Sequence, residues 1–347
     1  MEKFRPTKDL LMLYTFLALC LPAAVAVWVH GLHVLIVILV AVGVAIAAHV
    51  LSIYGLKREE VRHPFSAMVT GMIVALSYSF TVTATTQAVT QVLDDAIIVA
   101  ITAWLAEMIK KRQNFLNKKY VNPAGAAKLL VLTIIPLRGI AQYTLPLINL
   151  RTSWEFFFFP TEHSIYPLGN QTNFLKGVKL HYGENPIQTL ILLKNHGWIG
   201  ATSSIAVLIS ALALIVLLRG YIKWRIPLVY LSVMTVLSAS YWLIMSEGKY
   251  FPLELRVAFH VFTGSVFFLA FFMATDPPTT PLTHLGQGLF AVGLGVLTFV
   301  FQLGLNFFGG SILALVIMNL MVPLMDRVGI RKLKKPTPER IKLADRT

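Results

Sequence analysis

The chain contains few charged residues. Asp, Glu, Lys and Arg make up 13% of its 347 residues, about half of the roughly 25% that is usual in soluble domains. Hydrophobic residues make up 56%, and the mean hydropathy is +0.70. Apolar surface on this scale does not fit into one soluble core of this size. Water-soluble enzymes, disordered regulators and nucleic-acid-binding proteins are therefore excluded, and the composition predicts an integral membrane protein.

Cysteine is nearly absent as well. The one cysteine, Cys20, lies within an apolar run. A single cysteine excludes an internal disulfide, an iron–sulfur cluster held only by cysteines and a CxxCH haem attachment. The sequence also lacks a glycine-rich motif for nucleotide binding, so any nucleotide chemistry must belong to partner proteins.

Acidic residues are half as frequent as basic ones, 16 against 30, which gives a formal charge of +14. Eight of the basic residues lie in the last 21 positions, and others form short clusters between apolar runs. This distribution indicates membrane topology and contact with lipid headgroups rather than nucleic-acid binding.

Ten apolar stretches are long enough to cross about 30 Å of hydrocarbon as helices. The first is longer than a typical signal core, and we expect it to be a span rather than a cleaved signal peptide. The predicted spans are 10–29, 32–55, 65–82, 88–109, 123–148, 200–219, 226–246, 254–274, 283–303 and 309–326.

The basic residues give the orientation. If the N-terminus is cytoplasmic, 22 of the 30 Lys and Arg fall on the cytoplasmic side, and Lys249 is alone in the short outside loops. Because cytoplasmic loops are enriched in Lys and Arg, we expect a multi-pass protein of the cell inner membrane with both termini in the cytoplasm.

The two halves of the chain share short matches. An offset of 193 residues aligns Val69-Thr70-Gly71 with Phe262-Thr263-Gly264, and Thr90 with Thr283. Each half holds five spans, and an odd number turns the second copy upside down. The predicted fold is all-α and integral to the membrane, with two inverted five-helix repeats. The predicted parts are a first repeat at 1–149, an extracytoplasmic loop at 150–199, a second repeat at 200–326 and a basic cytoplasmic tail at 327–347.

Inverted repeats often bind ligands where helices are interrupted near the axis that relates them. The fifth span has Asn122-Pro123 at its start and Pro136 inside, and the tenth has Gly309-Gly310 and Pro323. These residues predict an interruption in the last helix of each repeat.

Ionisable residues within spans are candidates for function because burying them in a membrane is costly. Glu107 lies at helical spacing from Lys110 and Lys111, which predicts local pairing. Asp94 and Asp95 lie near the outside end of the fourth span. They either attract cations or are solvated at the interface, and solvation is the expectation.

Arg138 follows Pro136 and has no acidic neighbour in the sequence. It either pairs with Asp94 or Asp95, binds a phosphate bidentately or extends to the interface. His49 and His260 are further candidates, as ligands of a haem between helices.

Several stretches together resemble the RnfD protein of Rnf complexes and the NqrB protein of the sodium-pumping NADH:quinone reductase. The resemblance extends over nearly the whole chain, in order and spacing. It implies a flavin-carrying membrane protein without a catalytic site of its own. Such a protein relays electrons in a Na⁺ or H⁺ pump beside flavin and iron–sulfur subunits that oxidise NADH or ferredoxin. The stretches are Asn122-Pro123-Ala124, Trp224-Arg225-Ile226-Pro227-Leu228, Ala274-Thr275-Asp276-Pro277, Phe308-Gly309-Gly310, Met318-Asn319 and Val322-Pro323-Leu324-Met325-Asp326.

The resemblance also implies a covalent FMN, attached through its phosphate to a threonine in a Ser-Gly-Ala-Thr motif of the outside loop. Here the motif is degraded. Gly169-Asn170-Gln171-Thr172 has the right position in the chain. Ile199-Gly200-Ala201-Thr202 matches the residues of the motif better but lies at the start of a span, where Ser203 and Ser204 predict a helix cap. Thr172 is therefore the first candidate and Thr202 the second. Non-covalent flavin binding and loss of the flavin stay open.

A second flavin, such as riboflavin, is implied between the repeats. Cofactor-binding candidates beside the two threonines are Arg138, Asn122 and Asp276, although the Pro277-Pro278 sequence after Asp276 also predicts a simple turn. Two other functions remain open. One is a small-solute transporter similar to urea transporters, which share a five-plus-five inverted repeat. The other is a scaffold protein without a cofactor.

Overall fold

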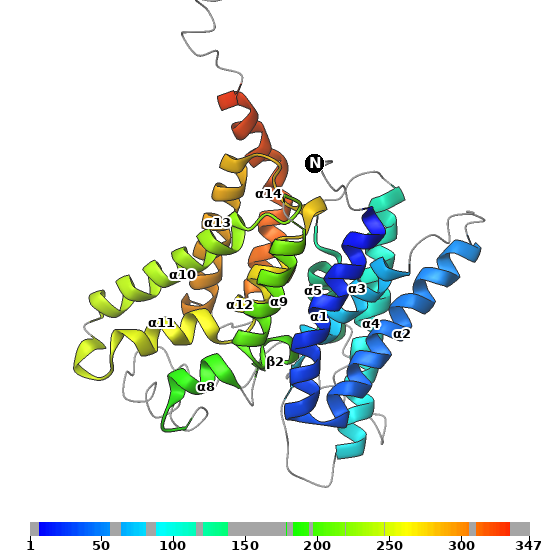
Figure 1. Ribbon diagram of the computed structural model, residues 1–347, viewed down its shortest axis with the longest axis horizontal. Helices are drawn as coiled ribbons and strands as arrows, with labels where there is room; N and C mark the ends of the chain where they lie inside the picture. The colour runs from blue at the N-terminus through cyan, green and yellow to red at the C-terminus, as the bar shows by residue number, and fades with distance from the viewer. Residues whose placement is uncertain are drawn as a thin grey trace, which may run out of the picture.

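The computed structural model of the chain is a bundle of helices with one short pair of strands (Figure 1). It describes residues 7–55, 64–80, 88–115, 121–137, 178, 183–193, 197–218, 220–245, 247–304 and 310–333. This agrees with the predicted all-α class. Residues Arg138 and Thr172 lie outside the described residues.

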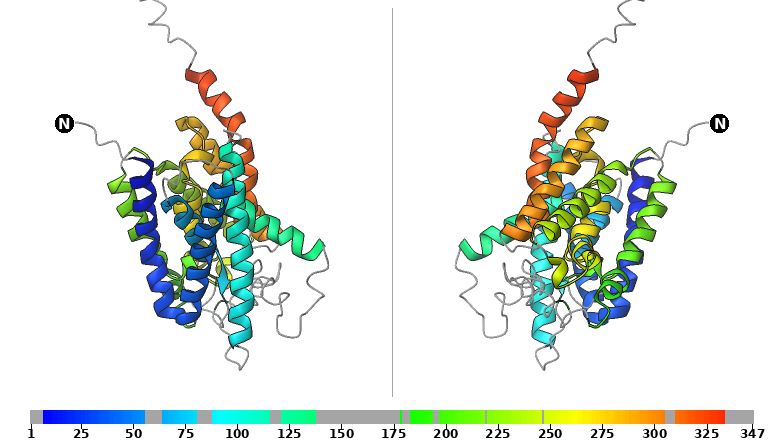
Figure 2. Two further views of the ribbon diagram at one scale, coloured as in Figure 1. Left: turned by 90° about the vertical axis from the view of Figure 1, so that its right-hand side faces the viewer. Right: turned by 90° about the vertical axis from the view of Figure 1, so that its left-hand side faces the viewer.

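The N-terminal helices pack as one group, in which α2 contacts both α3 and α4. Figure 1 shows them in blue and cyan, and in Figure 2 α5 leaves the bundle at a steep angle to α4. Their bounds are α1 Lys8–His30, α2 Leu32–Gly55, α3 Phe65–Leu76, α4 Ala88–Phe115 and α5 Pro123–Leu137.

The C-terminal helices form a second group, in which α13 packs against both α10 and α14. A π-helical turn, η5, continues α12, and short 3₁₀ turns connect several elements. The bounds are α8 Pro186–Leu192, η3 Ile199–Ala201, α9 Ser204–Leu217, α10 Arg225–Ile244, η4 Glu247–Lys249, α11 Leu253–Phe262, α12 Val266–Phe268, η5 Leu269–Met273, η6 Pro277–Thr279, α13 His284–Gly304 and α14 Gly310–Leu333.

Among the described residues, five helices are long and apolar enough to cross a membrane: α1, α2, α10, α13 and α14. A sixth span forms if α11 and the α12–η5 segment, bent by 61° at their junction, are counted together. The chain is therefore a membrane protein. The start of α1 and the end of α14 lie at the same end of the bundle (Figure 1).

Of the two predicted helix interruptions, the one in the tenth span does not lie at its proline. Pro323 lies inside α14, which continues to Leu333, so the predicted break at this proline is wrong. The eighth span is broken instead, between α11 and α12, where Gly264 has a φ of 64°. Glycine adopts this conformation without the steric cost that most side chains would bring. α3 also ends early, at Leu76, rather than crossing as a full span.

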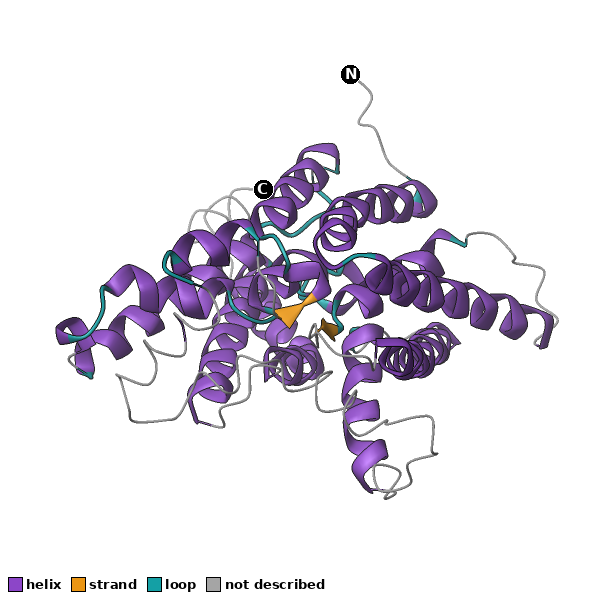
Figure 3. Ribbon diagram, turned by 90° about the horizontal axis from the view of Figure 1, so that it is seen from below, coloured by secondary structure: helices purple, strands orange, loops and turns teal. Residues whose placement is uncertain are grey.

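The early end of α3 is stabilised within the protein. The strands β1 Ser79–Phe80 and β2 Gly197–Trp198 pair in antiparallel fashion, near the middle of the bundle seen from below (Figure 3). Lys128 of α5 donates a hydrogen bond to the Ser77 carbonyl, and its Nζ atom lies 3.9 Å from the centre of the Trp198 ring. This hydrogen bond satisfies a carbonyl that has no partner within α3, so Lys128 stabilises a helix end that water does not reach.

α2 and α3 cross closely because Gly71 of α3 has no side chain. A Cβ at Gly71 would lie 2.6 Å from the Ala41 carbonyl oxygen and 2.8 Å from the Val42 Cα. Both atoms belong to the α2 backbone and cannot rotate away. The crossing fixes α3 against α2.

We expect Gly71→Ala to lower the free energy of unfolding by about 1–3 kcal/mol, because the added methyl overpacks the crossing. Gly43→Ala is the matched control, since a Cβ at Gly43 of α2 would have no atom within 4 Å, and alanine favours helix. Thermal unfolding of both variants in detergent checks this. Equal melting temperatures would contradict the close crossing.

Candidate functional site

A cavity of about 130 Å³ lies where the N-terminal helices meet the C-terminal group. One water needs roughly 10–15 Å³, and a cavity of about 150 Å³ holds a benzene molecule, so this cavity has room for several waters or one small ring. Its walls come from α1, α3, α4, α5, α9 and the segment from η5 to η6. Polar lining residues include Lys8, Thr70, Lys110, Gln113, Asn122 and Asp276, and apolar ones include Val69, Ile73, Leu214, Phe271 and Phe272. Two predicted site residues, Asn122 and Asp276, thus share one cavity.

Asn122 joins the two helix groups. Its side-chain oxygen accepts a hydrogen bond of 3.1 Å from the Gly125 N–H and so caps α5, while Pro123 takes the first helical position. Its side-chain amide donates to the Met273 carbonyl at the end of η5, at 3.4 Å. These contacts place the start of α5 directly against the broken eighth span.

Asn319 of α14 completes this junction. Its side-chain oxygen accepts from the backbone N–H of Asn122 at 3.0 Å, and its amide donates to the Thr279 carbonyl at 2.9 Å. Asn319 is fully buried, so both bonds replace contacts with water. No pattern in the sequence indicates that this residue contacts Asn122, because the two are 197 positions apart.

Asp276 begins the η6 turn, as its prolines predict. Its carboxylate accepts from the Thr279 hydroxyl at 3.1 Å, and its carbonyl accepts from the Thr280 hydroxyl at 2.9 Å. The predicted turn is therefore confirmed. Asp276 also lines the cavity, which a turn residue need not do.

Lys223, between α9 and α10, holds the turn from outside. Its ammonium donates to the carbonyls of Pro277 and Thr280, at 3.0 and 2.9 Å, and to the Thr280 hydroxyl at 2.6 Å. Burial lowers the pKa of Lys223 from its ordinary 10.5 to about 8, although the negative charges of Asp276 and Asp326 oppose this shift.

Asp326 of α14 supports the same region from the other side. Its carboxylate accepts from the backbone N–H of Leu282 at 2.9 Å and of Thr283 at 3.4 Å, just before α13 begins. A carboxylate at this helix start satisfies N–H groups that lack a partner within the helix.

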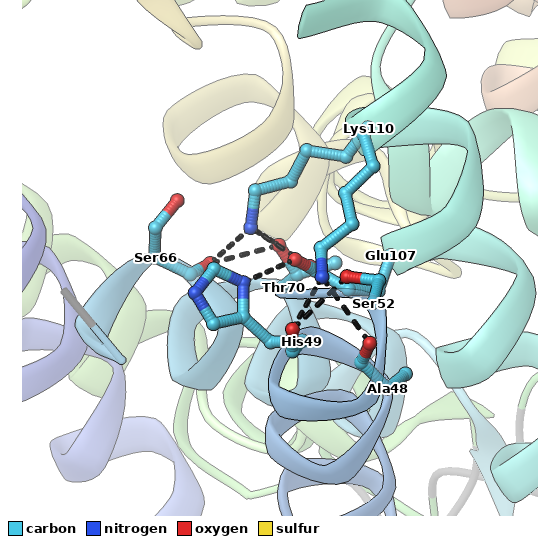
Figure 4. Close-up of polar contacts among 8 residues, drawn as sticks. Ala48, His49, Ser52, Ser66, Thr70, Glu107 and Lys110 are labelled. Atoms are coloured by element: carbon cyan, nitrogen blue, oxygen red, sulfur yellow. Dashed lines mark hydrogen bonds and ion pairs between the residues drawn. The ribbon is translucent and has the colours of Figure 1, made fainter. Parts of the chain in front are cut away.

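A chain of polar contacts begins at Lys110, which lines the cavity, and leads away from it (Figure 4). Lys110 donates to the Ser66 carbonyl at 2.7 Å and to the Thr70 hydroxyl and Glu107 carboxylate, both at 2.9 Å. The predicted pairing of Glu107 with Lys110 is confirmed. The other carboxylate oxygen of Glu107 lies 2.9 Å from His49 Nδ1. This second partner lies on α2, and the spacing within α4 could not predict it.

The two histidines proposed as haem ligands each contact a polar side chain. His49 contacts Glu107 through Nδ1, and His260 Nδ1 lies 3.0 Å from the Gln302 side-chain oxygen. His49 belongs to the N-terminal helices and His260 to the C-terminal ones.

Asp95 is not solvated at the interface, and that expectation is wrong. The residue is 2% exposed, its carboxylate lies 2.9 Å from His33 Nε2, and it accepts a hydrogen bond from the Tyr78 hydroxyl. The two side chains that contact Asp95 come from α2 and from the segment after α3. The sequence of α4 alone could not predict these contacts. The side chain of Asp94 lies outside the described residues.

Thr202 is buried beside the start of α9. Its hydroxyl donates to the Ile199 carbonyl at 2.8 Å and lies 3.1 Å from His30 Nε2. Ser203 accepts from the Ala206 N–H at 3.3 Å, so the predicted helix cap is confirmed for this serine.

Residues 5–334 match the protein family described as NQR2, RnfD, RnfE. The D component of the Na(+)-translocating ferredoxin:NAD(+) oxidoreductase complex of Acetobacterium woodii is 28% identical over 322 residues, which cover 91% of this chain and 89% of that protein. The D component of the proton-translocating ferredoxin:NAD(+) oxidoreductase complex of Clostridium ljungdahlii is 34% identical over 140 residues, 40% of each chain. The D component of an ion-translocating oxidoreductase complex of Stutzerimonas stutzeri is 35% identical over 132 residues, 38% of this chain and 35% of that protein.

The lowered pKa of Lys223 predicts a pH dependence of stability. Between about pH 8 and 10.5 the amine is neutral in the folded chain and protonated in the unfolded chain. The unfolded chain then binds the extra proton, so this group's contribution to the free energy of unfolding rises with pH across that window. We expect both Lys223→Met and Lys223→Arg, which do not titrate there, to lack this rise. Denaturant titrations from pH 7.5 to 10.5 check it, and parallel curves for wild type and both variants would contradict it.

Proposed function

Because the chain belongs to the NQR2, RnfD, RnfE family, we propose that it is the RnfD protein of an Rnf-type, ion-translocating oxidoreductase of the inner membrane. The observation that carries this proposal is the family match over residues 5–334, together with similarity to the A. woodii protein over 91% of the chain. It favours an electron-relaying protein over a small-solute transporter. Partner subunits with flavin and iron–sulfur centres oxidise ferredoxin or NADH, because this sequence has neither a nucleotide motif nor a cysteine cluster.

We infer two inverted repeats of five spans each. Two observations support this arrangement. The offset of 193 residues aligns Thr70-Gly71 of the short helix α3 with Thr263-Gly264 at the break after α11. The start of α1 and the end of α14 also lie at one end of the bundle, as an even number of spans requires (Figure 1).

The cavity is the proposed site of a non-covalent flavin, riboflavin or FMN. The chemistry of the lining suits one end of the ring system: Phe271 and Phe272 offer aromatic surface, while Asn122 and Gln113 offer amide donors for its polar edge. Each amide uses an N–H on a backbone carbonyl, of Met273 and of Val121, and has a second N–H. A bound flavin would supply a carrier that accepts and releases electrons. Asn122 would orient the ring, and the apolar walls would exclude water.

The proposed site of covalent FMN is Thr172. An ester to the phosphate requires that the threonine hydroxyl reach the attaching enzyme, whereas the Thr202 hydroxyl is buried and already bonded to the Ile199 carbonyl. Arg138 is proposed to bind the FMN phosphate, because guanidinium recognises phosphate bidentately. Electrons would then pass from the outer FMN to the flavin in the cavity.

We expect the chain, produced together with a flavin transferase, to fluoresce as a band on a denaturing gel. Thr172→Ala should abolish the band, because it removes the ester oxygen, and Thr202→Ala should retain it. Loss of the band only in Thr202→Ala would reverse the assignment. A dark band in wild type would exclude covalent attachment.

The cavity flavin has a separate test. Thr15 of α1 lines the cavity, so Thr15→Phe should fill it and reduce the flavin that acid extracts from the purified protein by about tenfold or more. Thr15→Val keeps the volume and is the control. Extractable flavin that is equal in Thr15→Phe and wild type would exclude this cavity as the site.

A further inference from the structure

His49, Glu107 and Lys110 form a continuous chain of proton-exchanging groups (Figure 4), of which Lys110 lines the cavity. The His49 Nδ1 and Lys110 Nζ atoms each lie 2.9 Å from a different oxygen of the Glu107 carboxylate. Both contacts are short enough for direct proton transfer in a hydrogen bond. The Glu107 cluster, as we call these three residues, therefore has no gap.

The two ends of the Glu107 cluster differ in their surroundings. The His49 side chain is 20% exposed, that of Glu107 only 1%, and Lys110 lines the cavity. His49 lies six residues before the end of α2, about 9 Å along the helix axis, on the side where the basic residues predict the cytoplasm. The cluster thus joins the outer surface of the bundle to the cavity through a buried carboxylate.

A purely structural ion pair does not need this composition. Lys110 already has two uncharged acceptors, the Ser66 carbonyl and the Thr70 hydroxyl, which hold its position. Glu107 adds a group that both accepts and donates a proton, and His49 adds the one side chain whose ordinary titration range includes neutral pH.

We propose that the Glu107 cluster carries protons, one at a time, between the cytoplasm and an electron acceptor in the cavity. This inference rests on the proposed function, which places a flavin in the cavity and supplies its electrons from partner redox subunits.

The transfer balances in three steps. Lys110 gives a proton from Nζ to the reduced group in the cavity and becomes a neutral amine. Protonated His49 gives its Nδ1 proton to one oxygen of Glu107, and the Glu107 carboxyl group then turns about its Cγ–Cδ bond and gives that same proton to the neutral Lys110 amine. The neutral His49 ring then turns outward, takes a proton from cytoplasmic water at Nδ1 and turns back, so that one proton has moved inward for each electron that arrived.

Other charged groups act on the same cluster. Lys111, one residue further along α4, donates to the carbonyls of Ala48 and His49, and Lys8 of α1 and Asp276 line the cavity near Lys110. The pH dependence of the cluster includes these three groups, and its tests must leave them unchanged.

The chain contains a matched control. His33 and Asp95 form a second buried histidine–carboxylate pair, at 2.9 Å, between the same two helices α2 and α4. His33 and His49 are 16 residues apart, about 24 Å along α2. Neither residue of this second pair is among those that line the cavity. Asp95→Asn therefore changes the same chemistry without touching the proposed path.

The test measures the midpoint potential of the cavity flavin in the full chain, by spectroelectrochemistry from pH 6 to 9. Proton uptake on reduction is followed in parallel with a pH indicator dye. We expect the wild-type potential to fall as pH rises and Glu107→Gln to slow proton uptake by about 100-fold. Asp95→Asn should behave as wild type, and Glu107→Asp should restore part of the rate. Uptake by Glu107→Gln at the wild-type rate would overturn the proposal.

Two further measurements separate the possible failures. If Glu107→Gln does not fold, His49→Gln keeps a hydrogen-bonding side chain next to Glu107 and must give the same slow uptake. If wild type binds no flavin, the assignment of a flavin to the cavity fails, and the path is judged on the ligand-free chain by NMR of labelled histidine. A His49 ring that titrates between pH 5 and 9, with a midpoint that moves in Lys110→Met, supports the path. A ring that keeps one protonation state throughout overturns it.

Discussion

Helix ends inside this protein need hydrogen-bond partners from distant parts of the chain, because hydrocarbon supplies none. α3 ends early, the eighth span is broken and α5 begins beside that break. Each of these points exposes backbone groups that a continuous helix would satisfy internally. The structure satisfies them with Lys128 at the end of α3, with Asn122 and Asn319 at the start of α5, and with Asp326 before α13. Much of the contact between the two helix groups follows from this requirement.

The cavity lies at the same junction, and this is a consequence of the interrupted helices rather than a separate feature. The η5 turn ends at Met273, whose carbonyl contacts Asn122, and the η6 turn begins one residue after Asp276. Asn122 and Asp276 both line the cavity. Polar groups that cap helix ends therefore also face the space in which we propose a flavin. The apolar residues of α3 and η5 complete its walls.

Charged residues within the bundle follow a common rule. Asp95 and Glu107 are both buried, and each contacts a histidine of α2. A buried carboxylate is tolerated only when paired and hydrogen-bonded, so these pairs also hold α2 against α4. The two pairs differ in what lies beside them, because only Glu107 contacts a lysine that lines the cavity. That difference, rather than the chemistry of the pairs, gives Glu107 its proposed role.

Much of this protein could be predicted from the sequence alone. Membrane class and helical architecture depend on hydropathy. Hydropathy is a local property of each stretch of sequence, and it determines whether that stretch is stable in the bilayer. Family membership depends on the motifs and their order along the chain. Two local contacts also depend only on residues that are close in sequence: the turn at Asp276 and the pairing of Glu107 with Lys110.

Tertiary structure alone decided the rest. The break at Gly264, the burial of Asp95, the bonds between Asn122 and Asn319 and the contact of His49 with Glu107 all depend on which helices meet. Pro323 shows most clearly what the sequence could not predict, because this proline predicts a break in the helix and yet lies inside a continuous one. A proline inside a helix removes one backbone hydrogen bond. Whether the helix ends there is determined by the packing around it, which the sequence of that helix does not contain.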